Sequence, residues 1–135
     1  MLNKIGHRGI AASEFALVAP VLLLLALGTF DIANAVQTSI RLERAVRAGA
    51  QFATANAADM EAIRSRVIAA WPELTTTDVA LPSLACECAG TAVACTESCP
   101  SGLVQTITVT AHRSLSPYLL RTVTQGTGSA VVRLR

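Results

Sequence analysis

Residues 9–31 read GIAASEFALVAPVLLLLALGTFD, an apolar run with one charge inside it. A membrane-spanning helix needs about 20 mostly apolar residues, and Ile10–Phe30 supplies 21 positions with Glu14 as the only charge. Pro20 would break a helix in water, but a membrane helix can satisfy the freed carbonyl locally, so we expect a kink there and not an end. The stretch predicts one transmembrane helix over residues 10–30.

The charges before this helix predict its orientation. Lys4 and Arg8 precede the apolar run, and the positive-inside rule keeps such a basic end in the cytoplasm. We therefore expect a cytoplasmic leader at residues 1–9, the membrane helix, and an extracytoplasmic domain at residues 31–135. With 135 residues in all, the chain has room for one domain beside the membrane segment.

Glu14 needs a physical reason, because a carboxylate in hydrocarbon costs at least a few kcal/mol. Two ordinary explanations are open. The stretch could be a secretory signal peptide cut at the A-x-A site of residues 33–35. It could also be a signal anchor in which Glu14 reaches back toward the cytoplasmic face.

A third explanation uses more of the residues, since Gly9 and Glu14 fit the G/xxxxE pattern of a type IV prepilin-like leader. The resemblance implies cleavage by a prepilin peptidase after Gly9, so that Ile10 becomes the new amino terminus. Glu14, followed by Phe15, would then meet the free amine of a neighbouring subunit. The two charges neutralise each other in hydrocarbon, whereas a missing partner leaves an uncompensated charge. Glu14 would therefore favour lateral assembly in one register.

A closer resemblance covers about the first 55 residues. Residues 8–36, RGIAASEFALVAPVLLLLALGTFDIANAV, resemble the N-terminal signature of TadE-like proteins, the pseudopilins of the tight-adherence (Flp) pilus system. The shared features are the arginine–glycine pair, Glu14–Phe15, Pro20, the leucine run and the later RAGAQFA stretch at 47–53. The resemblance implies a non-catalytic pseudopilin or minor pilin that acts in assembly or initiation of the pilus.

The same resemblance implies the partners and the location. The partners would be a prepilin peptidase, other pilins or pseudopilins of the system, the assembly platform in the inner membrane, and membrane lipid. The chain would cross the bacterial inner membrane once, with its C-terminal domain in the periplasm, or enter the extracellular pilus.

Beyond the membrane, the sequence predicts an α+β fold. The first helix continues to about Ala53, roughly 65 Å in all, and a second helix carries Met60, Ile63, Val67 and Trp71 on one face and ends at Pro72. Strands are expected at Val79–Leu81, Gln105–His112 and Ser129–Arg133. SPYLL at 116–120 is a loop whose leucines cover the sheet edge, and QGTGS at 125–129 is a turn. The elements make a small pilin-like domain, in which a short antiparallel sheet leans on the helices.

Four cysteines predict a disulfide-tied loop over residues 86–99. Cys86, Cys88, Cys95 and Cys99 follow the pattern C-x-C-x6-C-x3-C, and an even count outside the cytoplasm implies two disulfides. A Cys86–Cys88 bridge is strained, which leaves Cys86–Cys95 with Cys88–Cys99, or Cys86–Cys99 with Cys88–Cys95. A tetrahedral zinc site is the alternative, but the usual C-x2-C knuckles are missing. We expect disulfides and no metal.

Nothing in the sequence predicts catalysis, a cofactor or a nucleic-acid partner. His7 and His112 are the only histidines, and no catalytic or phosphate-binding motif is present. Aromatic residues make up 4%, and without Lys4 and Arg8 nine basic residues balance nine acidic ones. The alternative function is a secreted or membrane-anchored ligand-binding module whose disulfide loop meets a surface partner. The mature amino terminus separates these functions: Ile10 for a pilin, Val36 for a secreted protein and Met1 for an anchor.

Overall fold

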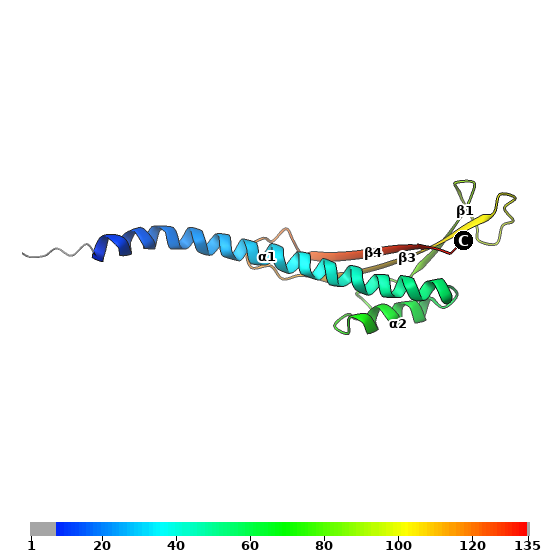
Figure 1. Cartoon of the computed structure of the whole chain (residues 1–135), viewed down its shortest axis with the longest axis horizontal. Helices are drawn as coiled ribbons and strands as arrows, with labels where there is room; N and C mark the ends of the chain where they lie inside the picture. Colours follow the sequence, from blue (N-terminus) through cyan, green and yellow to red (C-terminus); the bar gives the residue numbers. More distant parts are fainter. Residues whose placement is uncertain (1–7, 135) are drawn as a thin grey trace, which may run out of the picture.

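The computed structural model describes the backbone of residues 8–134 and the side chains of residues 12–134, so most of the predicted leader lies outside the described residues. Its main element is α1 (Arg8–Ala55), one helix of 48 residues. At 1.5 Å per residue it is about 72 Å long. Figure 1 shows α1 as a rod that carries the rest of the protein on its C-terminal part. The predicted long helix is confirmed, with two residues more at each end.

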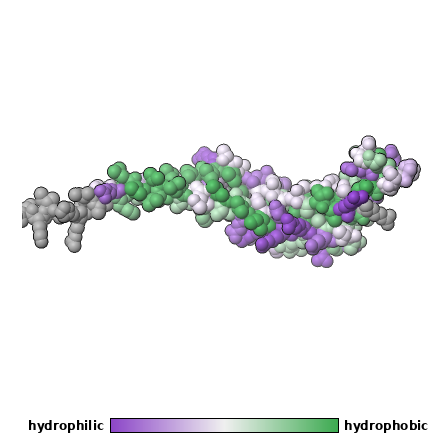
Figure 2. Space-filling model, turned by 45° about the horizontal axis from the view of Figure 1, so that its top comes forward, coloured by the Kyte–Doolittle hydropathy of each residue, from purple (hydrophilic) through white to green (hydrophobic). Residues whose placement is uncertain are grey.

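The first half of α1 is exposed and apolar. Leu17 is 79% exposed and Phe15 67% exposed, and Figure 2 shows hydrophobic surface along this half. In the described part of the chain, α1 is the one helix long and apolar enough to cross a membrane. Pro20 lies inside it without ending it. These features are those of a single-pass membrane protein.

Helix α2 (Met60–Ala70) packs against the second half of α1. The Asp59 carboxylate caps it by accepting the Ala62 N–H at 2.9 Å. Ile63 and Val67 are fully buried. The approach to α1 is close because Gly49 has no side chain: a Cβ there would lie 2.4 Å from Val67 Cγ2. The predicted second helix is therefore confirmed.

The remaining chain forms one antiparallel sheet in the order β2-β1-β3-β4. Its strands are β1 (Ser83–Cys88), β2 (Thr91–Val93), β3 (Leu103–Ser114) and β4 (Gln125–Arg133). The strands predicted at 105–112 and 129–133 lie within β3 and β4. The one predicted at Val79–Leu81 is wrong, because Val79 makes only an isolated bridge to Ala111. The α+β fold class is confirmed.

Residues 125–129, predicted as a turn, begin β4 instead. They pair with β3 from Gln125 opposite Ser114 to Ser129 opposite Thr110. Their glycines serve a close contact: a Cβ at Gly128 would lie 2.8 Å from the carbonyl carbon of Leu42. The backbone of β4 thus contacts α1 directly, and a side chain at position 128 would prevent this contact.

The hydrophobic core lies where the second half of α1 meets α2 and the sheet. It contains Leu42, Ala45, Val46, Ala50, Ala53, Ile63, Val67, Leu74, Val79, Ile107, Val109 and Ala111. No residue of this core comes before Leu42, so the core begins well beyond the apolar run. The core therefore packs on the outer half of α1.

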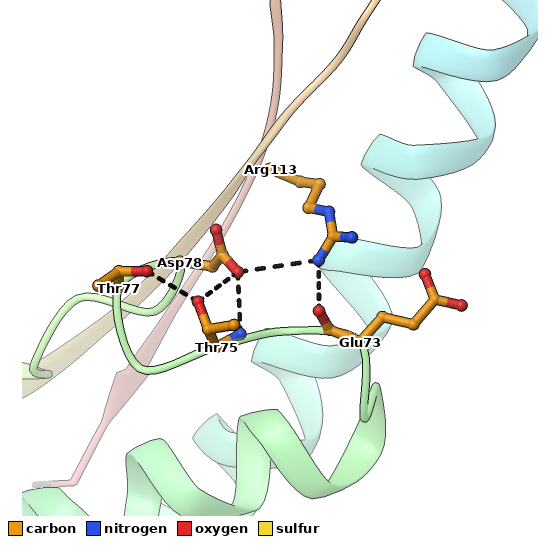
Figure 3. Close-up of polar contacts among 5 residues, drawn as sticks. All are labelled: Glu73, Thr75, Thr77, Asp78 and Arg113. Atoms are coloured by element: carbon orange, nitrogen blue, oxygen red, sulfur yellow. Dashed lines mark hydrogen bonds and ion pairs between the residues drawn. The ribbon is translucent and has the colours of Figure 1, made fainter.

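A polar network fixes the linker that leads from α2 to the sheet (Figure 3). The Asp78 carboxylate accepts the backbone N–H and the side-chain O–H of Thr75, both at 2.8 Å. On β3, the guanidinium Nη1 of Arg113 lies 3.8 Å from Oδ2 of Asp78. The same nitrogen donates a hydrogen bond to the backbone carbonyl of Glu73. The Thr75 donors, aided by Arg113 and against the effect of burial, hold the pKa of Asp78 below its ordinary value of 3.8.

Candidate functional site: the N-terminal helix and its outer end

Glu14 lies on an exposed, otherwise apolar stripe of α1. A helix turns about 100° per residue, so Val18, Leu25, Ile32 and Val36 all fall within about 40° of Glu14 around the axis. We call these five residues the Glu14 stripe. Its apolar members are 51–64% exposed. The stripe is turned about 100° from the face that carries Asp31 and Leu42, which are buried. It is therefore free to contact another molecule along much of the helix.

Pro20 borders a shallow apolar depression on another side of the same half-helix. The depression is lined by Ala16, Ala19, Pro20, Leu23 and Leu24. Small alanines there allow a neighbouring helix or lipid chain to approach the backbone closely. The predicted kink at Pro20 stays a prediction.

Asp31 ends the apolar run and holds a distant part of the chain. Its carboxylate accepts three backbone N–H groups, from Tyr118 at 2.9 Å, Leu119 at 2.7 Å and Leu120 at 2.9 Å. Asp31 is only 5% exposed. The N–H groups of Leu120 and Tyr118, and then that of Leu119, hold the pKa of Asp31 below its ordinary value of 3.8, although burial opposes this. The charged carboxylate thus fastens residues 118–120 to α1.

This attachment corrects the prediction for SPYLL at 116–120. The loop was expected to cover the sheet edge, but it lies against α1 at the end of the apolar run. The Phe30 and Tyr118 ring centroids are 5.8 Å apart, and a Cβ on Gly28 would lie 3.7 Å from Leu119 Cδ2. Figure 1 shows the segment between β3 and β4 running beside α1.

The N-terminal part of the chain is also where it resembles a known family. Residues 9–51 match the family model of TadE-like protein. The N-terminal helix is thus TadE-like. The match covers α1 almost to its end and stops before α2 and the sheet. No curated protein and no solved structure showed significant similarity to the chain.

The structure places the predicted cleavage and assembly residues together within the TadE-like segment. Gly9 and Ile10 are in the first turn of α1, and Glu14 and Phe15 follow within two turns. Glu14 and Phe15 are both exposed. The predicted cleavage after Gly9 and the predicted role of Glu14 in assembly are not tested by this geometry.

The four cysteines lie far from the TadE-like start of the chain, at the opposite end of the molecule (Figure 1). They form the disulfides Cys86–Cys95 and Cys88–Cys99, one of the two pairings left open. Strands β1 and β2 join through Ala89 and Gly90, both with positive φ, so the predicted loop contains a hairpin. Among residues 8–134 no cluster of His, Cys, Asp or Glu is placed to hold a metal ion.

Sequence reasoning missed the role of Asp31. The sequence shows an acid directly after the apolar run, but its three partners lie 87 to 89 residues further along the chain. They are backbone N–H groups, which every residue except proline carries, so no side-chain pattern marks them. The one signal in the sequence was an acid at the membrane boundary. A carboxylate removed from water there needs hydrogen-bond donors.

Proposed function

We propose that the protein is a non-catalytic pseudopilin or minor pilin of a tight-adherence pilus system. In this proposal a prepilin peptidase removes residues 1–9, and the mature chain acts in assembly or initiation of the pilus. The observation that carries the proposal is Glu14, a single acid on an exposed apolar helix whose TadE-like match begins at Gly9.

The charge of Glu14 supports the assembly role. A lone carboxylate at membrane depth is costly, and cleavage after Gly9 would create an ammonium group at Ile10 of every subunit. A neighbour shifted along the helix axis can bring its ammonium to Glu14, which cancels both charges. A pair that slips out of register leaves both charges uncompensated. Glu14 therefore selects the correct lateral contact.

The Glu14 stripe extends this contact beyond the membrane. Ile32 and Val36 are 54% and 53% exposed, although both follow the apolar run. Exposed apolar residues in a row on a helix are typical of a docking face. A neighbouring subunit that meets Glu14 would cover these residues in the same step.

Asp31 supports a mature chain that keeps its N-terminal helix. A signal-peptidase cut at residues 33–35 would remove the carboxylate that holds the N–H groups of residues 118–120. Those groups would then lose a charged acceptor. The secreted-module alternative is thus less compatible with the fold than a pilin.

The two disulfides support an extracytoplasmic domain, because structural disulfides form and persist in oxidising compartments. Together with Lys4 and Arg8 before the helix, they support an N-terminus in the cytoplasm and a C-terminal domain in the periplasm. The prepilin peptidase, sibling pilins and the inner-membrane platform are then the partners, and α1 contacts membrane lipid.

The first experiment is N-terminal sequencing of the protein isolated from native cells. We expect a chain that starts IAASEF, and we expect Gly9→Leu to accumulate the uncleaved form. A chain that starts at Val36 or Met1 would contradict the proposed processing.

The second experiment separates assembly from cleavage. Glu14→Gln keeps the shape of the side chain but removes its charge, so we expect normal cleavage and fewer pili. The number of pili should fall by roughly tenfold or more, because a loss of about 1.4 kcal/mol at each subunit contact weakens that contact tenfold. Glu73→Gln is the control, because it makes the same change at an exposed position outside α1. Normal piliation with Glu14→Gln would exclude the assembly role of Glu14.

A further inference from the structure

The loop that Asp31 holds has an unusual surface for a segment outside the core. In residues 116–121, which we call the outer loop, Tyr118 is 73% exposed and Leu119 is 41% exposed. Arg121 is exposed as well. Neither Tyr118 nor Leu119 belongs to the hydrophobic core. The fold therefore presents an aromatic, an aliphatic and a basic side chain close together.

The position of the outer loop is fixed against the end of the apolar run. Three hydrogen bonds join residues 118–120 to Asp31, the first residue after the run. Tyr118 lies beside Phe30, and Leu119 lies over Gly28. Since Gly28 is three residues before Asp31, Leu119 stands about 4–5 Å inside that boundary. If residues 10–30 span the membrane, the outer loop is level with the outer edge of the hydrocarbon.

The chemistry of the outer loop suits that level. Tyrosine is enriched at both membrane interfaces, where its ring meets the acyl chains and its hydroxyl meets water and headgroups. Arginine near such a boundary can extend its charge to lipid phosphates. Phe30, 56% exposed, adds a second ring at the same height.

We propose that the outer loop is a second membrane contact, in which Tyr118 and Leu119 insert into the headgroup and upper acyl region of the outer leaflet. Asp31 is the positioning residue, because it holds the loop backbone at this depth. The loop, together with α1, would fix both the depth of the helix and its rotation about its axis. The proposal rests on the membrane insertion of residues 10–30 and not on pilus assembly.

The test uses tryptophan fluorescence of the full-length protein in lipid bilayers that contain brominated phospholipids, because bromine quenches only nearby indoles. The chain has one tryptophan, Trp71. Trp71 lies one turn after Val67, which packs on Gly49, and Gly49 is about 27 Å beyond Asp31 along the helix. Wild-type emission should therefore be unaffected by bromine, which makes the natural protein the negative control.

The reporter is Tyr118→Trp in a Trp71→Phe background. We expect bromine near the headgroup end of the acyl chains to lower its emission about twofold, with a weaker effect from bromine near the chain ends. Leu24→Trp in the same background is the positive control, and it should show the opposite depth preference. Adding Asp31→Ala to the Tyr118→Trp reporter should reduce its quenching toward the wild-type level.

The outcomes separate this proposal from the membrane assignment itself. Quenching of Leu24→Trp without quenching of Tyr118→Trp overturns the loop contact alone, and means that the outer loop faces water or another protein. Absence of quenching in both overturns the loop contact together with the spanning helix. Circular dichroism of each variant shows whether the helices are retained. Full quenching of the reporter with Asp31→Ala present would overturn the positioning role of Asp31.

Discussion

Gly128 sits where the backbone of β4 touches the backbone of α1. A Cβ there would lie 2.8 Å from the carbonyl carbon of Leu42 and 2.9 Å from the nitrogen of Glu43. Neither backbone atom can move without shifting α1, so we expect Gly128→Ala to cost about 1–3 kcal/mol of unfolding free energy. Thermal unfolding of the detergent-solubilised protein measures this. Ser129→Ala, at the exposed neighbouring position, is the control, and an equal Tm for both variants would contradict the close contact.

The Asp78 carboxylate predicts how stability depends on pH. Its pKa is lowered in the folded protein, chiefly by the two donors of Thr75. A lowered folded-state pKa adds stability that is fully present above the ordinary value of 3.8 and is lost as the pH falls through the folded-state pKa. We expect Asp78→Asn to lower stability by about 1–2 kcal/mol at pH 7. The difference from wild type should shrink below about pH 4.

Thermal unfolding from pH 7 to pH 2.5 checks the Asp78 prediction. Glu61→Gln is the control, since Glu61 forms an exposed ion pair with Arg64 and such pairs are worth about 0–1 kcal/mol. A pH-independent difference between Asp78→Asn and wild type would show that the carboxylate charge is not the cause.

At this same scale, the sequence identified single residues whose chemistry is local. Glu14 stands out because one charge interrupts an apolar run, and the four cysteines stand out by type and spacing. The sequence predicted a turn at Gly126 and Gly128, because glycine favours turns. In the structure these positions are glycine because α1 lies within contact distance of them, and Leu42 of α1 is 86 residues before Gly128. A single sequence predicts that helix but contains no sign that it approaches these glycines.

Among the elements, the β1–β2 hairpin is the one that depends most on covalent bonds. Cys86–Cys95 joins β1 to the segment after β2, and Cys88–Cys99 closes the following loop. Apart from Cys86, residues 83–102 contribute no side chain to the buried core. We expect the double variant Cys88→Ser with Cys99→Ser to speed amide hydrogen exchange in residues 91–102 by tenfold or more. The reason is that loss of the disulfide lowers the free energy of local opening by about 2–3 kcal/mol.

Exchange in β3 and α1 should stay near the wild-type rate in that double variant, because their core contacts are untouched. The matched control is Cys86→Ser with Cys95→Ser, which removes the other bridge and a buried sulfur, and should also affect β1. Uniform acceleration across the whole domain in the Cys88–Cys99 variant would contradict a locally stapled hairpin.

The sequence predicted the helices and β3 better than β1, β2 or the start of β4. Val, Ile and Thr alternate through 105–112, and the apolar spacing of 60–71 is helical, so local pattern and final structure agree there. In residues 83–93 the cysteines concealed a hairpin whose turn is Ala89–Gly90. A β1 strand with exposed residues on both faces lacks the alternation that marks a half-buried strand.

The whole molecule joins a bare helix to a domain that covers one side of its outer half. The Glu14 stripe continues beyond the apolar run to Ile32 and Val36. A subunit contact along the stripe is therefore expected to depend on residues outside the membrane. We predict that Val36→Lys reduces piliation by tenfold or more while leaving cleavage and Tm unchanged, because Val36 is 53% exposed and a buried charge is costly.

Gln37→Lys introduces the same charge at the adjacent exposed position, about 100° further round the helix, and serves as the control. Piliation counts by electron microscopy, with immunoblots for cleavage, make the comparison. Equal piliation in the two variants would show that the stripe is not a contact face.

The resting of β4 on α1 also sets the order in which the protein can be completed. Leu42 and Gly128 touch although 86 residues separate them, and a ribosome adds those residues in roughly 4–17 seconds at 5–20 per second. During that interval the apolar face of α1 around Leu42 is not yet covered by β4. Strand β4 must therefore be translated before that side of α1 is covered, and a chain released before β4 is made would leave the side open to holdase chaperones and proteases.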